Sequence, residues 1–114
     1  TLTNGTAANT AALLDRNGLD GLVTRVISID EVRVWKPAAA PYLQAAGVVG
    51  VERHQLALVA AHAWDVHGAK RAGLLSGWVS RLEGEFPVTF DRPDVTGADL
   101  VEVVDRLLAL HDGA

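Results

Sequence analysis

The fold is decided by the apolar stretch Leu56-Ala57-Leu58-Val59-Ala60-Ala61 and by the turn His62-Ala63-Trp64-Asp65 that follows it. Six consecutive apolar residues predict a strand buried on both faces, as in a parallel sheet that helices cover. A helix is expected directly after the turn, over residues 65–72, with Gly73 ending it. A buried strand that runs into a helix is the building block of α/β proteins.

Strands and helices alternate along the rest of the chain. A short β-prone piece at residues 1–3 precedes a helix over residues 7–17, which Thr6 or Asn9 could cap. The other elements expected are strands at 26–29, 74–80 and 93–96, a helix over 39–46 ended by Gly47, and a helix over 100–110 capped by Thr96 or Asp99. This alternation predicts a three-layer α/β/α, Rossmann-like parallel sheet within one domain, residues 1–114.

Composition narrows the possible functions. Hydrophobic residues make up 49% of the chain and charged residues 21%, and the net charge is −4. Acidic and basic residues are interspersed without a Lys/Arg cluster, so we expect no nucleic-acid partner. Cysteine is absent, which excludes disulfides and cysteine-ligated metals within the chain. We expect no membrane span and, because the sequence shows no export signal, a cytoplasmic protein.

Polar side chains fall where the predicted strands end, which is where parallel sheets bind ligands. Thr3 and Asn4 follow the first strand and could offer donors to an anion, although taken alone they are better explained as a polar strand-to-helix turn. Lys36 could neutralise a carboxylate or phosphate, although most lysines are merely solvated. Asp65 could orient a water molecule or a cation, or could simply cap its helix.

A metal centre is not expected from the histidines. His62, Asp65 and His67 lie close together in the sequence, but they do not have the one-face spacing of helical zinc sites. The three tryptophans, Trp35, Trp64 and Trp78, are interpreted as packing residues.

The polar segments resemble a known family when they are taken in order. The segments are Thr3-Asn4-Gly5-Thr6, then Asp30-Glu31-Val32-Arg33-Val34-Trp35-Lys36-Pro37, then the run from His62 to Lys70. They are similar to the second half of the core of haloacid dehalogenase (HAD) superfamily hydrolases, over Leu2 to about Leu110. The L-2-haloacid dehalogenase branch matches best: there the pieces read Ser-Asn-Gly-Thr/Ser, Val-Tyr-Lys-Pro and Ser-Ser-Asn-x-Trp-Asp.

The resemblance implies a role for five residues. Thr3 and Asn4 match a pair that binds the substrate carboxylate or steadies the nucleophile. Lys36 matches a lysine that offsets negative charge beside the nucleophile, and Tyr42 matches a tyrosine that lines the site. Asp65 matches an aspartate that positions the lysine and the hydrolytic water. Lys36 and Asp65 are therefore the expected catalytic residues.

Three positions depart from the family pattern. His62, an expected substrate-binding residue, stands where this branch usually carries Asn, and Ala60 stands where it carries Ser. The phosphatase branches usually place a second acidic residue where Ala61 stands. With one carboxylate fewer, a Mg²⁺ site is less favourable. We therefore expect no cofactor, with Mg²⁺ bound through Asp65 as the alternative.

The resemblance also implies parts that this sequence does not contain. The nucleophilic aspartate of the family lies in an Asp-x-x-Gly-Thr/Ser segment on the central strand, and a cap domain covers it. Neither is found in these 114 residues, which contain no methionine. We therefore expect the C-terminal part of a HAD-like core, an incomplete sheet that is neither active nor stable alone. Its expected partners are an N-terminal segment of the same protein, a small anionic substrate and a second copy in a homodimer.

Three functions remain open at this point. The leading interpretation is a segment of a hydrolase that removes halide from a 2-haloacid through an aspartyl-ester intermediate. The second is a segment of a Mg²⁺-dependent phosphatase of the same superfamily. The third is a non-catalytic remnant that acts in binding or assembly.

Overall fold

The computed structural model describes residues 1–112. Its regular elements, in chain order, are β1 (Leu2–Thr3), α1 (Ala7–Arg16), β2 (Ile27–Ser28), α2 (Ala39–Val49), β3 (Ala57–Ala60), α3 (Ala63–Arg71), β4 (Leu75–Val79), β5 (Val95–Gly97) and α4 (Leu100–Asp112). Short 3₁₀ turns lie at Asp20–Leu22, Ile29–Glu31 and Arg53–Gln55. The predicted alternation of strands and helices is confirmed.

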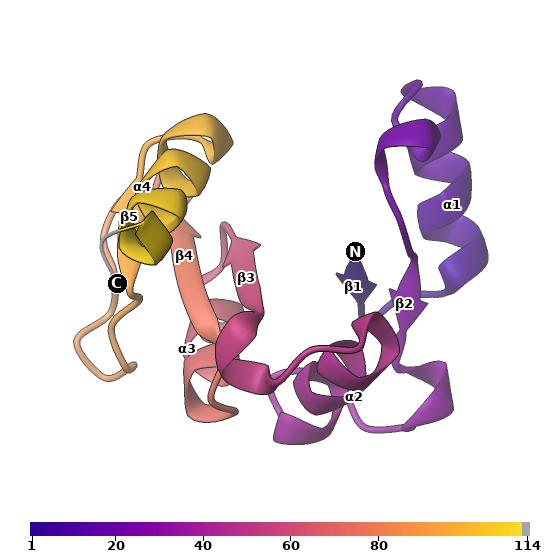
Figure 1. The fold of residues 1–114 in the computed structure, drawn as a ribbon, viewed down its shortest axis with the longest axis horizontal. Helices are drawn as coiled ribbons and strands as arrows, with labels where there is room; N and C mark the ends of the chain where they lie inside the picture. Colours follow the sequence, from indigo (N-terminus) through magenta and orange to yellow (C-terminus); the bar gives the residue numbers. More distant parts are fainter. Residues whose placement is uncertain (113–114) are drawn as a thin grey trace.

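The strands form two parallel sheets. In the first, β1 pairs with β2, and Leu2 lies opposite Ile27. In the second, β4 lies between β3 and β5, with Ala57 opposite Leu75 and Gly77 opposite Val95. Figure 1 shows the two sheets standing apart, with α2 below the gap, on the side of β1 and β2. Among the described residues, β1 and β3 each pair with one strand, so the expected incomplete parallel sheet is confirmed.

An apolar cleft lies between the two sheets. It has a volume of 360 Å³ and is lined by side chains from β1, β2, α2 and β3. The lining residues are Thr1, Leu2, Ile27, Ala45, Val49, Leu56, Ala57, Leu58, Val59, Asp65 and Leu74. Asp65 is the one charged residue in this set, so a candidate catalytic group opens onto the cleft.

The packing around α3 fixes the position of that group. Tyr42 from α2 is buried in a cluster with Ala69, Ala72 and Leu74, against which Leu2, Leu56 and Leu58 pack. Helix α3, which carries Ala69, therefore packs on β3, β4 and α2 together. This packing holds the first turn of α3 at the carboxyl end of β3, where ligands bind in such sheets.

Several boundaries differ from the expected ones. Helix α2 runs through Gly47 and ends at Gly50, whose φ of 75° is the left-handed conformation that glycine adopts readily. Gly47 was predicted to end the helix because sequence alone cannot distinguish a glycine within a helix from one that ends it. Helix α3 begins at Ala63, two residues earlier than expected.

The helix caps follow the expected pattern in part. Thr6 caps α1, because its hydroxyl accepts a hydrogen bond from the backbone N–H of Asn9 at 3.1 Å. Asp99 caps α4 by accepting from the N–H of Glu102 at 2.9 Å, whereas Thr96 lies within β5.

The tryptophan interpretation was correct for Trp78, which is buried, but wrong for Trp35, whose exposed fraction is 66%. Within the described part of the chain, no helix combines the length and the apolar character needed to cross a membrane.

Candidate functional site

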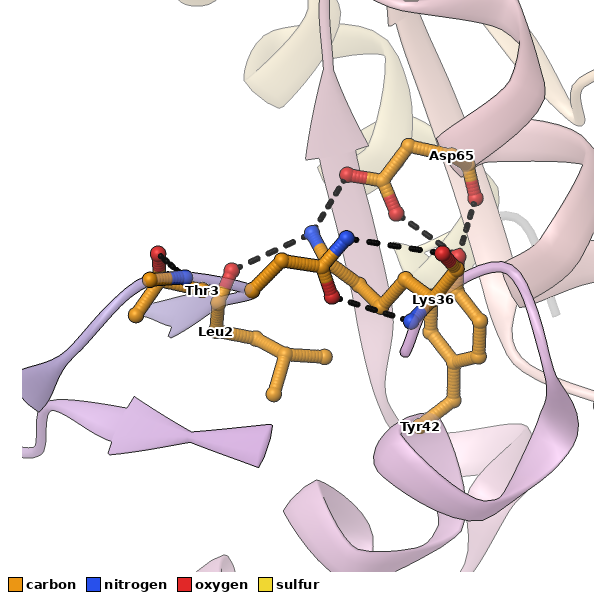
Figure 2. Close-up of polar contacts among 7 residues, drawn as sticks. Leu2, Thr3, Lys36, Tyr42 and Asp65 are labelled. Atoms are coloured by element: carbon orange, nitrogen blue, oxygen red, sulfur yellow. Dashed lines mark hydrogen bonds and ion pairs between the residues drawn. The ribbon is translucent and has the colours of Figure 1, made fainter. Parts of the chain in front are cut away.

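A buried ion pair between Lys36 and Asp65 forms the centre of the candidate site. Lys36 Nζ lies 2.7 Å from Asp65 Oδ2, and the side chains are 7% and 11% exposed. The same ammonium group donates a hydrogen bond to the backbone carbonyl of Leu2 at 3.2 Å. Figure 2 shows Lys36 reaching from its loop between β1 and α3. The two expected catalytic residues are thus in contact, and Lys36 links β1 with α3 beside Asp65, which lines the cleft.

Asp65 does not cap its helix. The N-cap position belongs to His62, and Asp65 is the third residue of α3. Its carboxylate instead accepts hydrogen bonds from Lys36 Nζ on one oxygen and from the Tyr42 hydroxyl on the other, both at 2.7 Å. The simpler explanation considered from the sequence is therefore wrong for this aspartate.

Tyr42 holds the carboxylate from the opposite side. Its side chain is fully buried, and its hydroxyl lies 2.7 Å from Asp65 Oδ1 and 3.0 Å from the Asp65 carbonyl oxygen. Burial raises the pKa of Tyr42 well above its ordinary value, and the hydrogen bond to Asp65 and its negative charge raise it further. The phenol therefore stays a neutral donor that orients Asp65, and this contact favours a positioning role for Tyr42.

The glycine at position 68 makes this close approach possible. A Cβ atom added to Gly68 in α3 would lie 2.5 Å from the Tyr42 hydroxyl and 2.7 Å from Pro37 Cβ. A side chain at this position would push the phenol away from Asp65.

Asn4 fixes the backbone of the lysine. Its Oδ1 accepts from the Lys36 N–H at 2.9 Å, and its Nδ2 donates to the Lys36 carbonyl at 3.4 Å. The Lys36 ammonium also lies 5.7 Å from the centre of the Trp64 ring, within the range of a cation–π contact. Asn4 is thus hydrogen-bonded to the Lys36 backbone, as expected if the polar residues after the strands lie close together.

Thr3 lies at the same strand end, but its hydroxyl makes a local hydrogen bond. Thr3 Oγ1 accepts from the N–H of Gly5 at 2.9 Å and shapes the turn after β1. The role in binding an anion that the resemblance implies for Thr3 and Asn4 stays a prediction.

The side chain of His62 contacts Glu83 and not the Lys36–Asp65 pair. Its side chain is 51% exposed, and Nδ1 lies 3.2 Å from Glu83 Oε2. Glu83 also accepts a hydrogen bond from the Ala63 N–H at 2.8 Å. This hydrogen bond lowers the pKa of Glu83, and the contact with His62 lowers it further. Sequence reasoning missed Glu83, because it lies in a segment without hydrophobic periodicity.

The donor set does not fit a Mg²⁺ ion. Both oxygens of Asp65 already accept hydrogen bonds, and an ammonium group lies where a cation would approach. Among the side chains that the structure describes, no three His, Asp or Glu residues are placed to share a metal. Hard cations need several oxygen ligands, and this chain supplies one carboxylate here.

Comparison with known proteins places this network in a family. Residues 1–79 match the family model described as haloacid dehalogenase-like hydrolase. (S)-2-haloacid dehalogenase 2 from Pseudomonas sp. (strain CBS-3) is 35% identical over 100 residues, which are 86% of this chain and 44% of that protein. Haloacetate dehalogenase H-2 from Moraxella sp. (strain B) is 29% identical over 109 residues, covering 96% and 47%.

A solved structure gives the same result. The L-2-haloacid dehalogenase from Xanthobacter autotrophicus with chloropropionic acid covalently bound is 26% identical, with a TM-score of 0.85. The match covers 93% of this chain and 52% of that one. The chain spans about half the length of the curated relatives it matches. The fold, the paired lysine and aspartate and these likenesses together show that the chain belongs to the haloacid dehalogenase-like hydrolases.

Proposed function

We propose that residues 1–114 supply one side of the active site of a hydrolase that removes halide from a 2-haloacid. The observation that carries this proposal is the buried contact of Lys36 with Asp65, 2.7 Å long, at an apolar cleft. The relatives named as (S)-2-haloacid and haloacetate dehalogenases support the substrate class. The nucleophilic aspartate would come from a segment outside these 114 residues.

The chemistry assigns a part to each charged group. A nucleophilic carboxylate attacks C2 of the haloacid, the carbon–halogen bond breaks, and halide leaves with its electron pair. Water then adds to the carbonyl of the resulting ester, which releases a 2-hydroxy acid and a proton and regenerates the carboxylate. Lys36 would stabilise the negative charge of the nucleophile and substrate, and Asp65 would hold Lys36 in place.

The cleft supports the proposed origin of the nucleophile. The facing edges of β1 and β3 have no strand between them among the described residues, and the cleft between them is apolar. A buried strand from the N-terminal segment would satisfy both edges and carry its aspartate toward Lys36. The homodimer that the resemblance implies stays a prediction.

The other two functions have less support. A Mg²⁺-dependent phosphatase would need oxygen ligands besides Asp65, and Ala61 offers none. A non-catalytic remnant would have no need of a buried ion pair, since apolar residues of similar volume are often at least as stable.

The test is halide release by the intact protein that contains these residues. The substrates are (S)-2-chloropropionate and chloroacetate, each with EDTA or with added Mg²⁺. We expect EDTA-resistant halide release, and restored release when residues 1–114 are combined with the segment that bears the nucleophile. Hydrolysis of p-nitrophenyl phosphate only in Mg²⁺, without halide release, would show the phosphatase instead.

A further inference from the structure

The first turn of α3 is held by a residue from another part of the chain. His62 occupies the N-cap position, yet its side chain makes no capping hydrogen bond within the helix. The cap comes from Glu83, 20 residues along the chain, whose Oε1 accepts from the Ala63 N–H at 2.8 Å. Helix starts without a cap leave backbone donors unsatisfied, so Glu83 satisfies a need that the local sequence does not.

The two oxygens of Glu83 engage different groups. While Oε1 binds the Ala63 N–H, Oε2 lies 3.2 Å from Nδ1 of His62, which can make this contact only as an N–H donor. Glu83 therefore binds both residues at the start of the turn, His62 and Ala63. The N–H groups of Asp65 and Val66 both donate to the His62 carbonyl, at 3.1 and 3.2 Å. A shift of His62 would thus move Asp65.

A second contact links the same turn to the lysine. The rings of His62 and Trp64 stack, with centroids 5.8 Å apart and planes 17° apart. The Trp64 ring in turn lies 5.7 Å from Lys36 Nζ. Asp65 therefore belongs to the turn that Glu83 holds, and Lys36 contacts the same turn through the ring of Trp64.

We propose that Glu83 is a positioning residue for the Lys36–Asp65 pair. It acts through its hydrogen bonds to His62 and Ala63 at the start of α3. Glu83 lies outside the residues that the family model matches, which end at Val79. The catalytic consequence rests on the proposed function. The structural part of the proposal, that Glu83 holds the first turn, does not.

The variants separate the two contacts of Glu83. Glu83→Ala removes both, whereas Glu83→Gln keeps a side-chain oxygen for the Ala63 N–H. The control is Glu85→Ala, which removes an exposed carboxylate from the same loop. Glu83 is itself at the surface, and Glu83→Gln provides a mild second variant if Glu83→Ala folds poorly. All variants are made in the intact protein.

Two measurements test the proposal. Loss of a helix cap should raise the equilibrium constant for local opening by a factor of about 5 to 10. Amide hydrogen exchange at Ala63 should therefore accelerate by that factor in Glu83→Ala. In halide release, kcat should fall about tenfold with KM within about twofold, because a misplaced group costs the chemical step more than binding. Glu83→Gln should recover most of kcat, and Glu85→Ala should change neither quantity.

Each other outcome contradicts the proposal in a defined way. Faster exchange with an unchanged kcat would show a purely structural cap. An unchanged exchange rate, or equal losses in Glu83→Ala and Glu85→Ala, would show that Glu83 holds nothing specific. If the wild-type protein releases no halide, the proposed function fails, and the exchange rates alone then decide whether Glu83 holds the turn.

Discussion

Lys36 Nζ and Asp65 Oδ2 lie 2.7 Å apart across 29 residues of sequence, with both side chains largely buried. Removing two charges from water costs several kcal/mol per ion, so such a pair persists only where further hydrogen bonds satisfy it. The Leu2 carbonyl and the Tyr42 hydroxyl provide those bonds. The arrangement fixes the Lys36 ammonium in one orientation beside Asp65, which lines the cleft, as charge stabilisation requires.

Substitution of the lysine should affect both stability and activity. Lys36→Met leaves Asp65 buried without its counter-charge, which should lower the free energy of unfolding by about 3 kcal/mol. The kcat for halide release should fall by a factor of about 100 to 1,000, as when a fixed charge-stabilising donor is lost. Urea unfolding and halide assays of the intact protein measure the two effects.

The matched control is Lys70→Met. Lys70 pairs with Asp94 at 2.5 Å, but it is 39% exposed and lies outside the site. We expect at most about 1 kcal/mol of destabilisation, as for more exposed pairs, and an unchanged kcat. If both variants lost kcat equally, a special role for Lys36 would be excluded.

The second prediction concerns Tyr42 at high pH. Because the folded state raises the pKa of Tyr42, its contribution to the free energy of unfolding is fully present below about pH 10. It is lost as the pH rises above that value, since the unfolded phenol then ionises. Tyr42→Phe cannot ionise and also removes the donor to Asp65 Oδ1, at a cost of about 1–3 kcal/mol.

The stability difference between wild type and Tyr42→Phe should therefore be constant from pH 7 to 9 and should shrink above pH 10. Urea unfolding at each pH measures it. Tyrosinate absorbance gives a second readout, because Tyr42 is the only tyrosine in these 114 residues. A tyrosinate signal that belongs to Tyr42 and titrates near pH 10 in the folded protein would contradict the prediction.

The sequence was sufficient to predict the α/β class and the placing of polar residues at the strand ends, and the resemblance implied that Asp65 positions Lys36. Parallel strands bring their carboxyl ends to one edge, so residues that follow different strands must converge there. Apolar runs such as residues 56–61 reveal the strands because burial dictates composition there. The Gly47 prediction failed because the conformation of a glycine depends on its neighbours in space.

Contacts between distant segments could not be predicted in the same way. Glu83 lies in a loop without periodicity, and nothing in its local sequence indicates that it caps a helix starting 20 residues earlier. The hydroxyl of Tyr42 could be assigned to the site by resemblance, but its contact with Asp65 depends on how α2 packs against α3. Side-chain geometry of this kind depends on the tertiary fold.

The third prediction concerns Glu83 at low pH. Because the folded state lowers the pKa of Glu83, its contribution to stability is present above about pH 4.5, the ordinary value, and is lost as the pH falls below it. The stability difference between wild type and Glu83→Gln should therefore diminish from pH 5 to pH 3. Thermal unfolding of the intact protein across this range measures it, with Glu85→Gln as control. The same trend in both variants would exclude a specific contact of Glu83.

The fourth prediction uses two helical glycines that differ in their surroundings. An added methyl group at Gly68 would lie 2.7 Å from Pro37 Cβ, 3.0 Å from Pro37 Cα and 2.5 Å from the Tyr42 hydroxyl, which is buried and hydrogen-bonded. Overpacking costs about 1–3 kcal/mol, which outweighs the gain of about 0.5–1 kcal/mol from alanine in a helix. Gly68→Ala should therefore lower the free energy of unfolding.

Gly47→Ala is the matched control for this substitution. Gly47 lies within α2, and apart from the adjoining helix backbone an added Cβ would meet no heavy atom within 4 Å. Only the higher helix propensity of alanine then counts, so Gly47→Ala should stabilise the protein by about 0.5–1 kcal/mol. Gly68→Ala should also lower kcat, because it displaces the phenol that orients Asp65, whereas Gly47→Ala should leave kcat unchanged. Stabilisation by both substitutions would show that the contact of α3 with Tyr42 is loose, and that Tyr42 does not position Asp65.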